Sequence, residues 1–143
     1  MIIRSEQIDV FNKIAEDNFV RKLSTHLRTN YAETMVRMPE ENSVLSELSD
    51  ETLESLVRFG IERAREYGIT FESSISTFIA IMFDVAPNFH THELAQPVLK
   101  DENTEANSRV NVLLEKLSGD EWKTIKGSYD TSAWQSANED KNE

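Results

Sequence analysis

Residues 49–87 read SDETLESLVRFGIERAREYGITFESSISTFIAIMFDVAP and decide the fold of this chain. Two apolar stripes with a spacing of three or four residues run through this stretch, which predicts two helices. The first stripe consists of Leu53, Leu56, Val57, Ile61, Ala64 and Tyr67, and the second of Phe71, Ile75, Phe78, Ile79, Met82, Phe83 and Ala86. Because only about two residues separate the helices, we expect an antiparallel hairpin or a sharp corner.

The ends of both helices carry recognisable signals. Ser49 is a typical N-cap residue, and Gly68 stands where a helix commonly ends with a left-handed residue. Thr70 is in position to cap the second helix, and Pro87 stops it. Gly60 falls on the apolar face of the first helix, where the missing side chain lets a neighbouring helix come close.

The segments on either side of the hairpin also have helical spacing. A first helix of about 25 residues follows Ser5, with one stripe made of Ile8, Phe11, Ala15, Phe19, Leu23 and Leu27. We expect residues 30–38 to continue as helix and residues 43–48 to form a helical turn. After Pro87, a short helix around residues 93–100 and a longer one after Thr104 are predicted, and Trp122 and Ile125 fold back onto the domain.

The sequence therefore predicts an all-α protein, a compact helical bundle of about five helices around a central buried helical hairpin. Residues 1–126 form a single helical domain in this interpretation. Residues 127–143 are polar and without period, so we expect a disordered acidic and polar tail in which Trp134 is a possible anchor. No segment alternates like a strand.

Composition limits the classes of function. The chain has 143 residues, a formal net charge of −11 and no cysteine. Disulfides and thiol chemistry are excluded, and the acidic balance argues against nucleic acid or an anionic membrane as a partner. The first residues lack the apolar core of a signal peptide, and no apolar run approaches the roughly 20 residues that span a bilayer. We expect a cytoplasmic protein whose oligomeric state the sequence leaves open.

The candidates for catalysis are few. His90 and His92 form a local pair of metal-type ligands, with Asp84 and Glu93 near them in sequence, but no third histidine or cysteine is nearby. Carboxylate pairs at helical spacing look exposed, and no glycine-rich phosphate loop or G-x-S-x-G motif is present. We expect no metal, no cofactor and no enzymatic activity; a metal-dependent hydrolase using the two histidines is the remaining enzymatic alternative.

Three residues are candidates for binding a partner protein. Phe59 and Arg63 lie off the apolar stripe of the first hairpin helix, and an exposed aromatic beside an arginine is typical of interface anchors. Phe89, just after the second helix, is the third candidate. The alternative for Phe59 is that the first helix or the C-terminal segment covers it.

The run LVRFGIERAREYGITFESSISTFIAIMFDVAPNF, residues 56–89, resembles a family of small bacterial proteins. The similarity rests on an R-x-G-I-E-R-A-x-x-Y-G-I segment at residues 58–69 and on an N-F pair after the apolar helix. The opening helix, led by Glu6 and Gln7, and the order of the later helices extend it over most of residues 1–125. The shared residues form a packing signature, so no functional residue is carried over.

Genes of this family lie beside type VI secretion effectors, their spike-tip PAAR proteins and their DUF4123 adaptors. The resemblance implies a non-enzymatic accessory factor that binds the effector or its adaptor and acts as a co-chaperone in effector loading. It also leaves open an immunity protein that binds and neutralises the cognate toxin.

Overall fold

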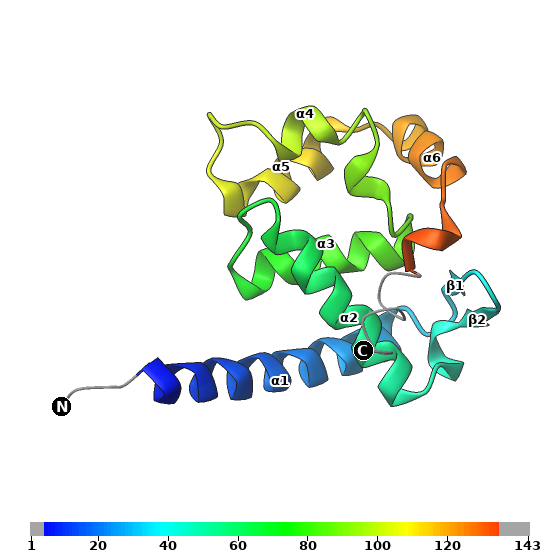
Figure 1. Cartoon of the computed structure of the whole chain (residues 1–143). Helices are drawn as coiled ribbons and strands as arrows, with labels where there is room; N and C mark the ends of the chain where they lie inside the picture. Colours follow the sequence, from blue (N-terminus) through cyan, green and yellow to red (C-terminus); the bar gives the residue numbers. More distant parts are fainter. Residues whose placement is uncertain (1–4, 135–143) are drawn as a thin grey trace.

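A computed structural model describes residues 5–134, with side chains from residue 13 onward. Figure 1 shows three levels: helix α1 along one side, α2 and α3 in the middle, and α4, α5 and α6 on the opposite side. A small two-stranded sheet lies at one end. The all-α prediction with a central helical hairpin is confirmed, with six α-helices in the part of the chain that is described.

Helix α1 (Ser5–Asn30) is the long amphipathic helix predicted from its stripe. Leu23 and Leu27 are buried, Phe19 is half-buried, and Ala15 is exposed. The side chains of Ile8 and Phe11 lie outside the described residues. Figure 1 shows that the first turns of α1 extend past the ends of α2 and α3, so the body covers mainly the second half of this helix.

The prediction of helix for residues 30–38 is wrong. Strands β1 (Met35–Arg37) and β2 (Asn42–Val44) form an antiparallel pair in which Val36 faces Ser43. Val36 is buried between two exposed neighbours, which is the two-residue period of a strand rather than helical spacing. The turn is closed by a hydrogen bond from Met38 N–H to the Glu41 carbonyl. The helical turn predicted for residues 43–48 is present only as the short 3₁₀ helix η1 (Leu45–Glu47), since residues 43 and 44 belong to β2.

Helices α2 (Asp50–Arg65) and α3 (Glu72–Asp84) are the predicted hairpin. The Ser49 side chain caps α2 by accepting a hydrogen bond from Thr52 N–H, and Gly68 is left-handed with φ of 80°. The predicted cap at Thr70 is wrong, since α3 begins after Phe71 without a side-chain cap of its own. Phe71, placed on the buried stripe by its spacing, is instead 60% exposed.

The two hairpin helices touch where α2 has no side chain. A Cβ atom at Gly60 would lie 2.8 Å from Ile79 Cγ1 and 3.3 Å from Met82 Sδ. This spacing is far below an ordinary contact, so glycine is required for α3 to sit this close to α2. The predicted close approach at Gly60 is confirmed.

The second half of the chain forms a layer of short helices over α3. They are η2 (Phe89–Thr91), α4 (Gln96–Leu99), η3 (Ala106–Ser108), α5 (Arg109–Lys116), α6 (Gly119–Gly127) and η4 (Thr131–Trp134). Val110 and Leu113 of α5 are buried, and Ile125 and Trp122 of α6 pack on the core as predicted. Ser118 and Glu121 form a capping box that starts α6.

The prediction of a disordered tail from residue 127 is wrong for residues 127–134. Gly127 ends α6, and the following segment ends in η4 with Trp134 at 0% exposure. A buried indole needs neighbours from elsewhere in the fold, which the local polar composition of residues 127–143 does not reveal. Residues 135–143, the remainder of the predicted tail, lie outside the described residues.

Among the residues that the structure describes, no helix is both long and apolar enough to cross a membrane.

Candidate protein-binding surface

The predicted anchors Phe59 and Phe89 are inside the protein. Phe89 is fully buried, with its ring centroid 4.9 Å from that of Phe78. Phe59 is 8% exposed and lies against Trp134, with 6.2 Å between ring centroids. The C-terminal segment therefore covers Phe59, which was the alternative interpretation of this residue. Neither phenylalanine is an exposed anchor in this structure.

Arg63, the third predicted residue, reaches the surface along the Phe59 ring. Its guanidinium carbon lies 4.9 Å from the ring centroid, a cation–π contact. Its Nη2 forms an ion pair of 2.7 Å with Glu66, while Nε is buried without a hydrogen-bond partner. The ion pair leaves this edge of the protein with neighbouring charges of both signs.

His90 belongs to a buried polar network. Its Nδ1 is 3.0 Å from the Tyr67 hydroxyl, and the side-chain amide of Gln96 donates to that same hydroxyl. Burial, with the nearby Arg63 charge, lowers the pKa of His90 from 6.5 to about 4, so the ring is neutral at pH 7. Burial also raises the pKa of Tyr67.

The second histidine has a separate environment. His92 Nδ1 accepts a hydrogen bond from Leu94 N–H. Within residues 13–134, whose side chains are described, no three histidine, aspartate or glutamate side chains gather in a way that could hold a metal ion.

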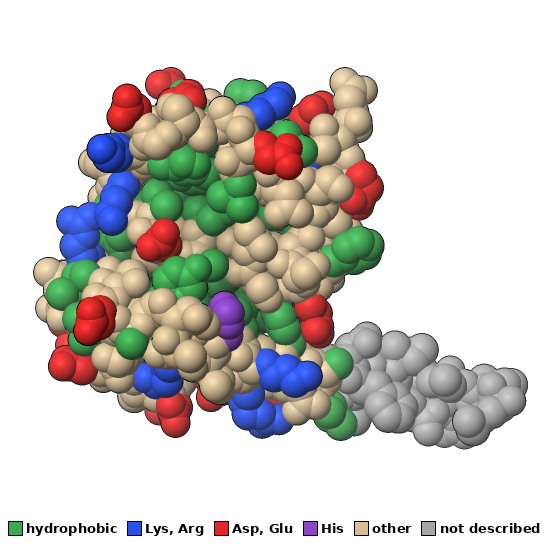
Figure 2. Space-filling view, turned by 180° about the vertical axis from the view of Figure 1, so that it is seen from behind, with side chains coloured by type: hydrophobic (Ala, Val, Ile, Leu, Met, Phe, Trp, Pro, Cys, Tyr) green, Lys and Arg blue, Asp and Glu red, His purple; other side chains and the backbone are tan. Residues whose placement is uncertain are grey.

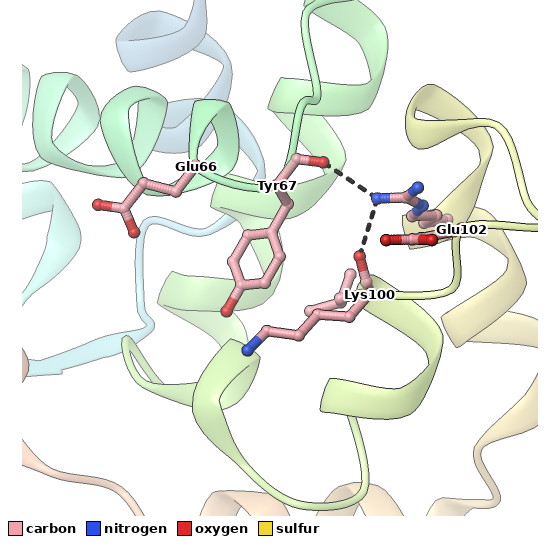
Figure 3. Close-up of a pocket in the computed structure, with 6 residues that line it drawn as sticks. Glu66, Tyr67, Lys100 and Glu102 are labelled. Carbon is pink, nitrogen blue, oxygen red and sulfur yellow. Dashed lines mark hydrogen bonds between the residues drawn. The ribbon is translucent and has the colours of Figure 1, made fainter.

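A polar pocket of about 550 Å³ opens beside this network, between the end of α2 and the segment from α4 to α5 (Figure 3). Arg109 closes its back wall by donating to the carbonyls of Thr104, Tyr67 and Leu99. In Figure 3 the Lys100 side chain extends toward the hydroxyl end of Tyr67, and Glu66 lies on the far side of that residue. Because Arg109 is held by three backbone carbonyls, its main role here is to fix the loops around the pocket.

The carboxyl groups with displaced pKa values do not suit proton transfer. Hydrogen bonds from the Asn103 and Asn107 N–H groups lower the pKa of Asp101 and of Glu105, respectively. A catalytic acid working near neutral pH needs a carboxyl pKa that is raised.

A groove of about 490 Å³, which we call the α1 groove, runs between α1 and the corner joining α2 to α3. Its walls combine apolar and charged side chains: Lys13, Ala15, Glu16, Phe19, Ile61, Arg65, Thr70, Glu72 and Ile75. The apolar groups come from all three helices, and the charged groups stand beside them. Protein interfaces likewise combine apolar and polar groups.

Ion pairs join α1 to α2 beside the α1 groove. Arg65 contacts Glu16 at 2.7 Å, and Arg58 contacts Asp17 at 2.8 Å. These side chains are between 29% and 47% exposed, so each pair contributes less than about 1 kcal/mol to stability. Their main effect is to fix the direction in which α1 leaves the body.

The surface near the α1 groove exposes large apolar side chains. Phe71, next to the groove residues Thr70 and Glu72, is 60% exposed, and Ile14 of α1 is 51% exposed. Figure 2 shows hydrophobic side chains also gathered in a hollow on the face seen from behind, with charged side chains mostly around it. The α1 groove has no direct signal in the sequence, although Ala15 and Phe19 lie on the predicted stripe of the first helix.

Comparison with protein-family models, with curated proteins and with solved structures found no match to this chain.

Proposed function

We propose that this chain is a non-enzymatic accessory factor of a type VI secretion effector locus. It binds the effector or its DUF4123-type adaptor and acts as a co-chaperone in effector loading. The family resemblance of residues 56–89 supports the locus, and the α1 groove supports the binding role. The observation that carries the proposal is the change in burial along the apolar stripe of α1. Leu23 and Leu27 on this stripe are buried, whereas Ala15, nearer the start of the helix, is exposed.

The chemistry of the α1 groove indicates the kind of segment that fits it. Half-buried Phe19 and exposed Ala15 offer an apolar surface for a large apolar side chain of the partner, beside the buried Ile61 and Ile75. The net charge of −11 favours basic residues at the flanks of that segment, because opposite charges speed association and stabilise the rim. The partner segment is therefore an amphipathic stretch with basic flanks.

Co-purification tests the binding role. The chain is co-expressed with the products of the adjacent open reading frames, and each is tested for a stable complex. We expect a complex with the effector or the adaptor. If no neighbouring product binds, the proposal is wrong.

A matched pair of variants then locates the surface. Ala15→Glu places a carboxylate in the α1 groove, whereas Thr25→Glu adds the same charge at an exposed site further along the helix. We expect Ala15→Glu to weaken the complex about tenfold or more and Thr25→Glu to leave it nearly unchanged. Equal effects of both variants would exclude the α1 groove as the contact.

The immunity alternative is separated by a different readout. Cells that express the toxin domain alone are tested for rescue by this chain without the adaptor. If this chain alone rescues the cells, the protein is an immunity protein and the co-chaperone proposal is wrong. If the toxin still kills the cells and the chain improves effector loading, the proposal is supported.

A further inference from the structure

Residues 128–134, which we call the C-terminal strap, lie across the protein after α6 ends. Figure 1 shows this orange to red segment leaving α6 on the side of the small sheet and ending beside the end of α3. The strap is linked to the rest of the chain through Gly127, the last residue of α6. Its contacts with distant parts of the sequence fall into three groups.

The first group consists of hydrogen bonds from the Asn88 side chain to the backbone of the strap. The Asn88 side chain donates to the Ser128 carbonyl at 3.0 Å and accepts from Asp130 N–H at 2.9 Å. A carboxamide that bonds both a carbonyl and an N–H group holds an extended or turning chain whatever its side chains are. Asn88 is therefore a general clamp for a peptide.

The second group is centred on Tyr129 at the edge of β1. Its hydroxyl accepts from Arg37 N–H at 3.1 Å and donates to the Arg37 carbonyl at 3.2 Å. The Arg37 guanidinium lies over the tyrosine ring, 4.2 Å from its centroid. Tyr129 thus occupies backbone groups that an incoming strand would otherwise use.

The third group consists of the contacts of the Trp134 side chain. The indole centroid lies 5.0 Å from that of Phe83 and 6.2 Å from that of Phe59, and its Nε1–H donates to the Tyr129 hydroxyl. The two aromatic side chains of the strap are thereby joined to each other as well as to the body. The strap therefore contacts the body through a tyrosine and a tryptophan five residues later.

We propose that the strap groove, formed by Arg37, Phe59, Phe83 and Asn88, is a peptide-binding site that the protein's own strap keeps filled. Its external ligand is a segment of a partner protein that has the same spacing of tyrosine and tryptophan and ends in a 3₁₀ turn, as the strap does. Charge favours a partner over a second copy of this chain, because two molecules of net charge −11 repel each other. The inference goes beyond the proposed function, since it concerns another surface and holds for any partner.

The tether explains how such a site is controlled. A segment attached through Gly127 competes at an effective concentration in the millimolar range, so a free peptide rarely displaces it. Binding of the external segment requires the strap to be weakened or pulled away. Phe59 and Phe83 are then the residues that the partner covers.

A peptide assay on the full chain tests this site. Fluorescently labelled GSYDTSAW, the sequence of residues 127–134, is titrated into the wild type and into Trp134→Ala, and anisotropy is followed. We expect the variant to bind about tenfold or more tightly than the wild type. The peptide GSYDTSAA, which lacks the tryptophan, should bind neither the wild type nor Trp134→Ala. Trp122→Ala is the matched control, because Trp122 lies on α6 outside the strap, and it should behave as the wild type.

Each remaining outcome decides the question. If Trp134→Ala is folded and does not bind GSYDTSAW, the inference is wrong. If it is unfolded, recovery of its helical circular dichroism on adding the peptide supports the site, and no recovery overturns it. A wild-type dimer that the peptide dissociates would make a second copy the ligand and overturn the assignment to a partner. The assay needs no effector, so its failure and a failure of the co-purification test are independent.

Discussion

At the level of single residues, Gly60 sets how closely the two central helices approach. Gly60→Ala would bring a Cβ atom to 2.8 Å from Ile79 Cγ1. Alanine gains about 1 kcal/mol of helix propensity, but forcing a methyl group into a filled core costs about 1–3 kcal/mol and more where backbones must separate. We expect a net loss of about 1–2 kcal/mol in the free energy of unfolding, measured by urea denaturation.

The control for this variant is Gly119→Ala. Gly119 is the first residue of α6, and a Cβ atom there would meet nothing within 4 Å. This substitution should be neutral or slightly stabilising. A Gly60→Ala protein that is as stable as Gly119→Ala would show that α2 and α3 are not in such close contact.

His90 makes stability depend on pH. Its pKa in the folded protein is about 4, below the ordinary 6.5, because the neutral ring is buried. At pH values between 4 and 6.5, His90 binds a proton in the unfolded chain but not in the folded chain. The free energy of unfolding therefore falls as pH drops from 6.5 to 4, by up to about 3 kcal/mol from this group. Urea denaturation at pH 7 and pH 4.5 should show this fall in the wild type.

His90→Gln should have a smaller fall over the same interval. His26→Gln, at an exposed histidine, should keep the wild-type fall. If the wild type and His90→Gln lose the same amount of stability between pH 7 and pH 4.5, His90 does not hold its ring neutral. Comparing the variants cancels every contribution to this fall that the three proteins share.

At the level of elements, the start of α3 depends on a residue from a later helix. Asn107 of η3 accepts hydrogen bonds from Thr70 N–H and Phe71 N–H, both at 2.8 Å. Asn107→Ala would remove the oxygen that accepts both hydrogen bonds, and we expect a loss of about 1–2 kcal/mol in unfolding free energy. Asn111→Ala, at an exposed position in α5, is the control and should be nearly neutral. Hydrogen exchange at Thr70 and Phe71 should quicken only in Asn107→Ala.

How well each element could be predicted follows from where its signal lies. The helical spacing of apolar residues continues through residues 53–64, and the end signals Ser49 and Gly68 lie next to the helix that they bound. The central helical hairpin was therefore predictable. The strands have three residues each, too few for a two-residue period to stand out. The cap of α3 could not be found, because Asn107 is distant in sequence.

The candidate site was less predictable than the fold, for the same physical reason. Phe59 lies off the stripe of α2, and only the position of Trp134 in three dimensions decides that it is buried. The α1 groove needs residues from three helices, and their relative placement is tertiary information. Arg63 was expected to be exposed because it lies off the same stripe of α2; its side chain is 33% exposed, with Nη2 paired to Glu66 and Nε buried without a hydrogen-bond partner.

At the scale of the whole molecule, Trp134 joins the end of the described chain to α2, α3 and the small sheet. Trp134→Ala should lower the free energy of unfolding by about 3–5 kcal/mol, because a fully buried indole leaves a large cavity. Trp134→Phe should cost less, since it keeps the ring contacts and loses only the hydrogen bond to Tyr129. Thermal and urea denaturation measure both. A loss below 1 kcal/mol in the alanine variant would mean that the strap is not seated as described.

The late position of Trp134 has a consequence for biosynthesis. Synthesis runs from the N-terminus, so Phe59 and Phe83 emerge from the ribosome well before the residue that shields them. Every nascent chain therefore displays these two rings for a time, and a message cut short before codon 134 yields a product that displays them permanently. Chaperones and proteases that detect uncovered aromatic surface thus gain a simple means of telling finished molecules from incomplete ones.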